Sequence, residues 1–156
     1  MPSRRGVCQP SRIEVQSMLR SAGSLLAGVL SLLISSFAIE LVVDAILLRT
    51  WPLAFPNKQA LAASNPVMAL TLGYSLPCAV LAGWVTARVA GKAEMKHAWA
   101  LAAVQEVLTL LAMVAHVAPA PNWVWACNLT LVPLAIVMGG RWRAAQSAKP
   151  AANNPS

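Results

Sequence analysis

The chain has 156 residues, of which 58% are hydrophobic and 11% are charged, and its mean hydropathy is +0.61. A soluble domain carries about 25% charged residues, so this composition excludes a soluble fold and most nucleic-acid-binding modules. The formal net charge is +7, from 12 Lys and Arg against 5 Asp and Glu. In a membrane protein such an excess first indicates orientation, and we expect no nucleic-acid partner.

Four apolar segments are each long enough to cross a hydrocarbon core about 30 Å thick, which takes about 20 helical residues. They cover about residues 21–47, 67–90, 97–117 and 123–140. Only a helix satisfies its backbone polar groups within one segment in lipid. We therefore expect an all-α integral membrane protein whose domain, residues 21–140, is a four-transmembrane-helix bundle in contact with the lipid bilayer.

The start of the first segment allows two interpretations. A capping-box pattern from Ser11 to Glu14 predicts that the helix begins near Arg12 and continues unbroken into the membrane. Alternatively, the segment is a signal peptide cleaved after Ala38, which would leave three spans. We favour the uncleaved span, because apolar residues resume at once after this site and continue to residue 48.

The connections between the segments contain helix breakers. Prolines interrupt the chain after the first span and before the fourth, at Pro52, Pro56, Pro66, Pro119 and Pro121. Each proline removes a backbone donor and disfavours helix just before it. The polar run from Gly91 to Glu94 is short, so the second and third spans must form an antiparallel hairpin.

Basic residues gather on one side of the predicted bundle. Ten of the 12 Lys and Arg lie before the first span, around the hairpin or after the fourth span, whereas Arg49 and Lys58 lie on the other side. The positive-inside rule then places both termini in the cytoplasm. We expect a basic cytoplasmic segment over residues 1–20, a basic, disordered cytoplasmic tail over 141–156, and a location in a bacterial inner membrane.

Small residues form a face on the second span. Ser75, Ala79, Gly83 and Ala87 recur every four residues, and such a helix-packing face lets backbones approach closely in lipid. Together with the short connections, this face favours a scaffold that forms a homo-oligomer or joins a larger membrane complex. That is the leading functional hypothesis from the sequence.

Several polar residues lie near the bilayer midplane when residues are counted from each cytoplasmic end. The candidates for a midplane polar site are Ser35, Ser75, Gln105, Glu106, Thr109 and Asn128. They either bond to backbones and to one another, each bond contributing about 0.6 kcal/mol, or form a binding or conduction site. The alternative function is therefore a small oligomeric transporter or channel subunit.

Glu106 is ionisable in the middle of a span, where a charge costs about 2.5 to 3.5 kcal/mol. It either forms an ion pair with Arg88 across the hairpin or carries a proton and bonds to Gln105 or a hydroxyl group. The rise from the level of Arg88 to Glu106 is ~11 Å, the limit for two long side chains. These structural roles compete with proton or cation handling.

Glu40 and Asp44 lie one helical turn apart and share a face, a geometry that suits holding a cation or sharing a proton. Glu40 lies 19 residues beyond Ser21, which places it at the outer interface. We therefore expect a solvated or interfacial pair, on the face opposite the small residues of this span.

Nothing in the sequence specifies a reaction. The three cysteines form no CxxC pair, which argues against a disulfide framework and a structural zinc site. His97 and His116 are isolated from other metal ligands, so we expect interfacial hydrogen bonding from them. No nucleophile lies beside a base and no metal cluster is visible. We expect no enzyme, no catalytic or metal-binding residue, and no cofactor.

Overall fold

The computed structural model describes residues 12–115 and 120–152. Five helices form this part of the chain: α1 Arg12–Thr50, α2 Lys58–Ala62, α3 Asn65–Ala90, α4 Glu94–Val114 and α5 Asn122–Ala152. Four of them are long and apolar enough to cross a membrane. The prediction of an all-helical chain with four such helices is confirmed.

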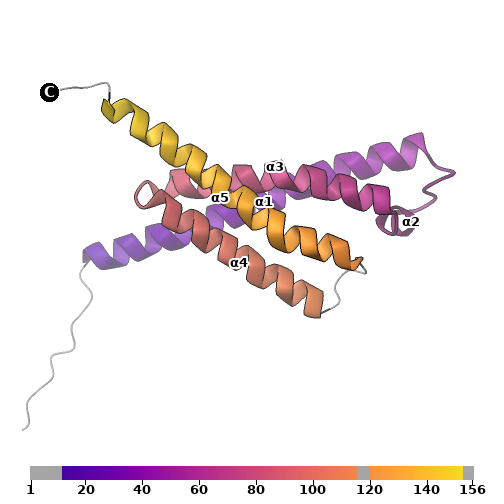
Figure 1. Cartoon of the computed structure of the whole chain (residues 1–156), viewed down its shortest axis with the longest axis horizontal. Coiled ribbons are helices and arrows are strands. Elements are labelled where there is room, and N and C mark those ends of the chain that lie inside the picture. The colour runs from indigo at the N-terminus through magenta and orange to yellow at the C-terminus, as the bar shows by residue number, and fades with distance from the viewer. Residues whose placement is uncertain (1–11, 116–119, 153–156) are drawn as a thin grey trace, which may run out of the picture.

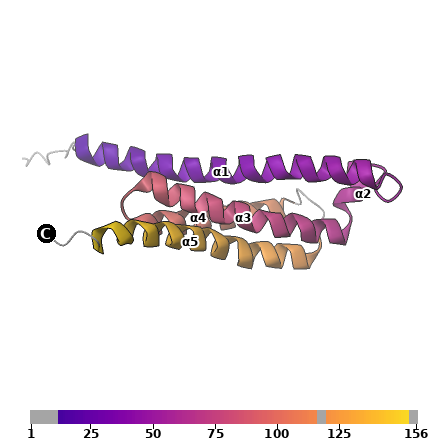
Figure 2. The same cartoon turned by 90° about the horizontal axis from the view of Figure 1, so that it is seen from above.

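The four long helices are arranged around α3, which packs against α1, α4 and α5. Helix α1 lies along one side of the molecule and α5 along the opposite side (Figure 2), and these two helices do not contact each other. Helices α1 and α3 diverge from α4 and α5 toward the end that carries α2 (Figure 1). We name this the α2 end, and the opposite end, where α3 turns into α4, the hairpin end.

The hairpin turn depends on a residue in the left-handed conformation. Gly91 has a φ of 64° and donates its N–H to the carbonyl of Ala87 at 3.2 Å, which ends α3. Glycine adopts this conformation without the steric cost of a Cβ. Ala93 also has a positive φ, 52°, immediately before α4. The short polar run therefore forms the antiparallel hairpin that the sequence predicts.

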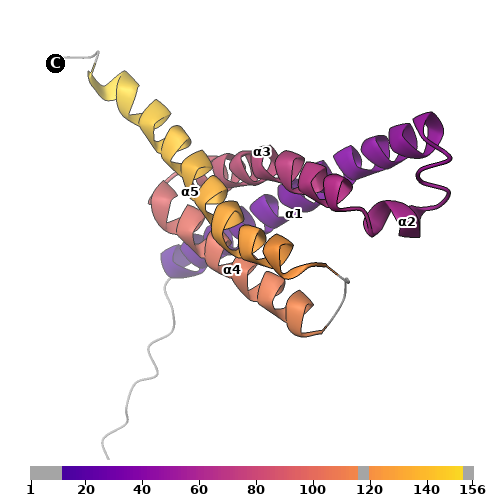
Figure 3. The same ribbon diagram turned by 45° about the vertical axis from the view of Figure 1, so that its right-hand side comes forward.

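Helices α3 and α5 cross with their backbones in contact (Figure 3). A Cβ added to Gly83 would overlap the carbonyl of Ile136, and one added to Gly139 would overlap the carbonyl of Val80. The core around this crossing consists of Ala79, Ala82, Leu101, Ala102, Val132, Ala135, Ile136 and Val137. Close backbone approach thus closes the bundle in its hairpin half.

Helix α1 is attached mainly by contacts on α3. Gly28 lies against the Thr86 hydroxyl and the Leu101 side chain, and Ser24 is fully buried. Even so, only 6% of the apolar window of α1 is buried inside the protein, against 33% for α5. Helix α1 is therefore the least covered of the four long helices.

The connection after α1 contains a short helix that the proline pattern did not indicate. Asn57 caps α2, because its Oδ1 accepts the N–H of Ala60 at 2.8 Å. Leu61 of α2 is buried in a second apolar cluster with Leu47 of α1 and Val67 of α3. This cluster fixes α2 against the ends of the two helices it joins.

Helix α5 extends through residue 152, where the sequence analysis expected a disordered tail from 141 onward. Alanine, the best helix former, supports this extension, and two long-range hydrogen bonds hold it. Trp84 Nε1 donates to Gln146 Oε1 at 3.2 Å, and the Ser147 hydroxyl donates to Glu94 Oε1 at 2.9 Å. Residues 153–156 lie outside the described part of the chain, as do Ser11 of the capping box and His116.

Candidate functional site

Two cavities adjoin between the helices that diverge toward the α2 end. The larger, about 390 Å³, lies among α1, α2, α3 and α5, and the smaller, about 270 Å³, lies among α1, α3, α4 and α5. Glu40, Ser75 and Asn128 line both cavities. We name these three residues, from α1, α3 and α5, the junction.

Helix geometry explains why the junction is open. Because α1 and α5 do not contact each other, Glu40 and Asn128 approach a shared space from opposite sides of α3. The smaller cavity ends at Val132, which belongs to the core around the α3–α5 crossing. The space between the helices therefore stops where this crossing begins.

Hydrogen bonding at the junction leaves acceptors free. The Ser75 hydroxyl donates to the Leu72 carbonyl at 2.8 Å, and Asn128 Nδ2 donates to the Val124 carbonyl at 3.1 Å. The Ser75 donor and one of the two Asn128 N–H donors are thus directed at the backbone of their own helices, and among the described residues no donor is bonded to the Asn128 Oδ1 or to the Ser75 oxygen. The Glu40 carboxylate adds further acceptors.

The two carboxylates of α1 differ in their surroundings. Asp44 forms an ion pair with Lys58 of α2, with 3.3 Å between Asp44 Oδ2 and Lys58 Nζ. The Asp44 side chain is 16% exposed and the Lys58 side chain 70%. Glu40 forms no ion pair with any residue that the structure describes. Glu40 is exposed, as expected of a solvated carboxylate, whereas Asp44 is ion-paired, and both residues line the larger cavity.

The structure divides the predicted midplane cluster. Ser75, Asn128 and Gln105 line the cavities, and Gln105 Nε2 donates to Thr109 Oγ1 at 3.3 Å. Thr109 and Ser35 line neither cavity; their hydroxyls donate to the carbonyls of Gln105 and Ser31 at 2.9 and 2.7 Å. The hydroxyl groups of these two residues are therefore hydrogen-bonded to the backbone of their own helices.

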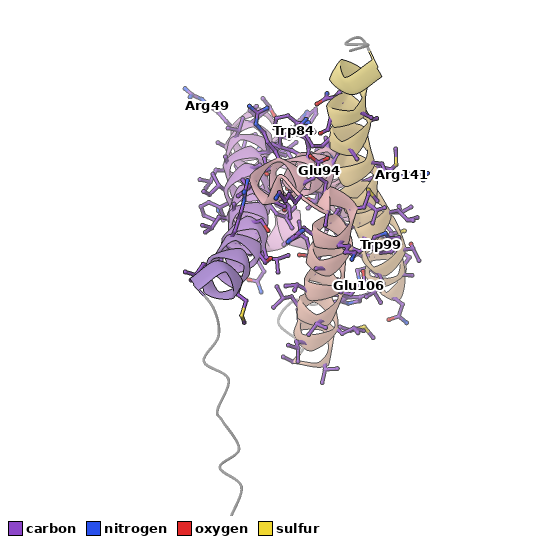
Figure 4. All side chains as sticks on the ribbon, turned by 90° about the vertical axis from the view of Figure 1, so that its left-hand side faces the viewer. Arg49, Trp84, Glu94, Trp99, Glu106 and Arg141 are labelled. Atoms are coloured by element: carbon purple, nitrogen blue, oxygen red, sulfur yellow. The ribbon has the colours of Figure 1, made fainter. Side chains whose placement is uncertain are left out.

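Glu106 also lies outside both cavities, on α4 beyond Trp99 (Figure 4). Its Oε1 is buried and has no hydrogen-bond partner within the described structure. Gly140 of α5 lies against Ala98 of α4, because a Cβ added to Gly140 would contact Ala98. The two helices are antiparallel, so eight residues from this contact Glu106 is level with Val132.

Arg88 and Glu106 are not brought together. The Arg88 guanidinium lies 5.1 Å from the centre of the Trp84 ring, a cation–π contact. Among the described residues, the ion pairs join Lys58 to Asp44 and Arg143 to Glu94, the latter at 4.0 Å. Figure 4 shows Trp84 and Glu94 near each other at the hairpin end, with Glu106 further along α4.

The small-residue face of α3 is occupied within the chain. Ala79 and Ala87 are fully buried, and Gly83 lies against the backbone of α5. Ser75, at one end of this face, lines both cavities instead. The face is thus continuous with the junction.

Sequence reasoning did not identify the cavities beside Glu40 or the ion pair between Lys58 and Asp44. The one available signal was that Glu40 and Asp44 share a helix face, because two carboxylates on one face suit a cation. In the parts of the chain with described coordinates, no group of three His, Cys, Asp or Glu could hold a metal ion.

Comparison with protein-family models, curated proteins and solved structures finds no match to this chain.

Proposed function

We propose that the chain is a multi-pass protein of a bacterial inner membrane, with both termini in the cytoplasm, and acts as the solute-binding subunit of a small transporter. The basic residues support this orientation, because Arg20, Arg88, Lys92, Lys96, Arg141 and Arg143 belong to the hairpin end. The α2 end, with the larger cavity, then faces outward.

The observation that carries the proposal is the junction itself. Three long helices each place a polar side chain against the same space, and that space is unfilled. Ligand-binding cavities commonly measure about 300 to 1,000 Å³, and the larger cavity lies within this range. Ionisable residues of membrane helices commonly mark functional sites, and Glu40, on the apolar helix α1, lines both cavities.

The distribution of packing suits a transporter in one of its states. The hairpin half is closed by Ala79, Ala82, Leu101 and Ile136, all nearly or fully buried, whereas the α2 half is open at the junction. A solute entering from the α2 end would therefore stop at the α3–α5 crossing. Four helices enclose little volume, so a complete pathway requires a homo-oligomer or a partner subunit.

The second candidate is the scaffold role, as a subunit that acts by helix packing alone. The α3 face that suggested it is covered by α5, so a partner would need another surface. Helix α1, with 6% of its apolar window buried, offers the most uncovered surface. A scaffold has no need of the junction, and this difference separates the two candidates.

The test is to fill the junction. Ser75→Trp places an indole in the shared space from α3, and Asn128→Trp does so from α5, in case one variant fails to fold. Val107→Trp is the matched control, because Val107 is 55% exposed on α4 and lines neither cavity.

Binding is measured by thermal shift in detergent and uptake in proteoliposomes, over a panel of cationic, anionic, zwitterionic and neutral solutes. We expect one class to bind and be taken up by the parent and Val107→Trp but not by the filled variants. Binding without uptake, by a chain that is a homo-oligomer in the proteoliposomes, would contradict a pathway formed by this chain alone, and binding of no class would contradict the proposal as a whole.

A further inference from the structure

We propose that the junction binds a protonated amine carrying a small apolar body, with the ammonium group against Glu40. This inference rests on the proposed solute-binding function and names the chemical class of its solute. It follows from the charge, the hydrogen-bonding groups and the apolar walls of the two cavities.

The charge of the cavity walls favours a monovalent cation. Among the residues that the structure describes, Glu40, Asp44 and Lys58 are the charged ones in the two linings. Asp44 and Lys58 neutralise each other in an ion pair, so one negative charge remains, on Glu40. An anion would be repelled by this carboxylate, and a neutral solute would gain no charge pairing from it.

The hydrogen-bonding groups of the junction favour a donor. The Ser75 hydroxyl directs its donor at a backbone carbonyl, the Asn128 amide directs one of its two N–H donors at another, and Glu40 has only acceptors when ionised. Gln105, in the wall of the smaller cavity, directs one of its two amide N–H donors at Thr109. An ammonium group carries three donors and no acceptor, so it complements the free acceptors of all three junction residues.

The remaining walls favour an apolar body attached to that ammonium group. The smaller cavity presents Leu32, Leu33, Phe37 and Val132, and the larger presents Leu61, Val67, Met68, Leu72 and Val124. Since the junction lies where the two cavities meet, an ammonium group held there can direct an alkyl or aryl group into either. The hydroxyls of Ser36 and Thr71 each line one cavity alone.

The experiment titrates the purified full-length chain, in lipid nanodiscs, with 2-phenylethylammonium and three comparators of similar size. Trimethyl(2-phenylethyl)ammonium keeps the charge but has no N–H donor, 2-phenylethanol is neutral, and 3-phenylpropionate is an anion. Empty nanodiscs correct for partitioning into lipid. Because charge-assisted hydrogen bonds are strong, we expect each comparator to bind at least about tenfold more weakly than 2-phenylethylammonium.

The variant that tests the counter-charge is Glu40→Gln, which keeps the size of the side chain and removes its charge. We expect it to bind 2-phenylethylammonium about tenfold more weakly. Glu106→Gln is the matched control, because it neutralises a carboxyl group outside both cavities, and its affinity should equal that of the parent. Gel filtration checks that each variant is folded.

Two results would overturn the inference. One is unchanged affinity in Glu40→Gln, and the other is equal or tighter binding of 2-phenylethanol or 3-phenylpropionate. If one of those two comparators binds and Ser75→Trp abolishes that binding, the solute-binding function stands and the amine is wrong. If no member of this set or of the wider solute panel binds, both proposals fail.

Discussion

Gly83 of α3 lies directly against the backbone carbonyl of Ile136 in α5, with no room for a side chain between them. Gly139 makes the reciprocal contact with the carbonyl of Val80. These two glycines let the helices cross at backbone distance in the hairpin half of the bundle. The same crossing sets where the helices begin to diverge, and therefore where the cavities end.

Gly83→Ala tests this crossing. The added Cβ would meet backbone atoms of Ile136, which cannot move aside as a flexible side chain can. We expect a loss of about 1 to 3 kcal/mol in stability, typical of overpacking, measured as a lower melting temperature in detergent. Gly73→Ala is the control, because nothing lies within 4 Å of the Cβ position there. Equal melting of both variants would show that α3 and α5 are not in backbone contact.

Gly28→Ala tests the attachment of α1. Its Cβ would meet the Thr86 hydroxyl and a methyl group of Leu101, which are side-chain atoms able to shift. We therefore expect a smaller loss than for Gly83→Ala, about 1 kcal/mol, by the same melting measurement. Gly23→Ala is the control, since its Cβ position is open. A larger loss at Gly28 than at Gly83 would contradict the view that α1 is held mainly by side-chain contacts.

The ion pair between Asp44 and Lys58 joins α1 to α2. Because Lys58 is largely exposed, we expect Lys58→Gln to cost about 1 kcal/mol or less and to make the connection around α2 more sensitive to added protease. Asp44→Asn should have a similar effect, and the double variant should lose little more than either single variant. Full additivity of the two changes would show that the residues do not interact.

The amino-acid sequence predicts the four long helices and the hairpin because these depend on local properties. A long apolar segment must satisfy its own backbone polar groups in lipid. A short polar run between two such segments makes the two helices antiparallel. The capacity of Gly83 for close contact is equally visible, although its partner, the carbonyl of Ile136, is not.

The candidate site could be predicted only in part, because it depends on how helices rotate and diverge. Heights along the spans place Arg88 within reach of Glu106, but rotation about the helix axis sets Arg88 against Trp84 instead. The sequence predicts a solvated or interfacial Glu40 but not the cavities beside it, because these depend on the separation of α1 from α5. Lys58 reaches Asp44 through α2, a helix of 5 residues that is too short to give a periodic pattern.

The proposed orientation is tested by cysteine labelling of intact cells, in a background where Cys8, Cys78 and Cys127 are replaced by serine. Labels at Asn57 and Asn122, at the α2 end, should react with a membrane-impermeant reagent. Labels at Ala93 and Ser147, at the hairpin end, should react only after the cells are opened. The reverse pattern would place the cavities on the cytoplasmic side and overturn the orientation.

Variants of Glu106 test whether its carboxyl group has a structural or a functional role. Its buried Oε1 has no hydrogen-bond partner in the described structure, and an unsatisfied buried polar atom costs about 1 to 3 kcal/mol. Glu106→Met removes that cost and fills a similar volume, so we expect a higher melting temperature in detergent. Arg88→Gln should change it little, because Arg88 contacts Trp84, and the two changes should be additive.

Two other outcomes for Glu106 would each require a different interpretation. If Glu106 pairs with Arg88 in the membrane, each single change should destabilise the protein and Glu106→Met with Arg88→Gln should recover part of the loss, because one uncompensated buried charge is worse than none. If Glu106 handles protons or cations, Glu106→Gln should remain folded while pH-dependent flux in proteoliposomes disappears. We expect neither of these two outcomes. Because Glu106 lies outside both cavities, we expect Glu106→Met to be more stable than the parent and Glu106→Gln to retain solute binding.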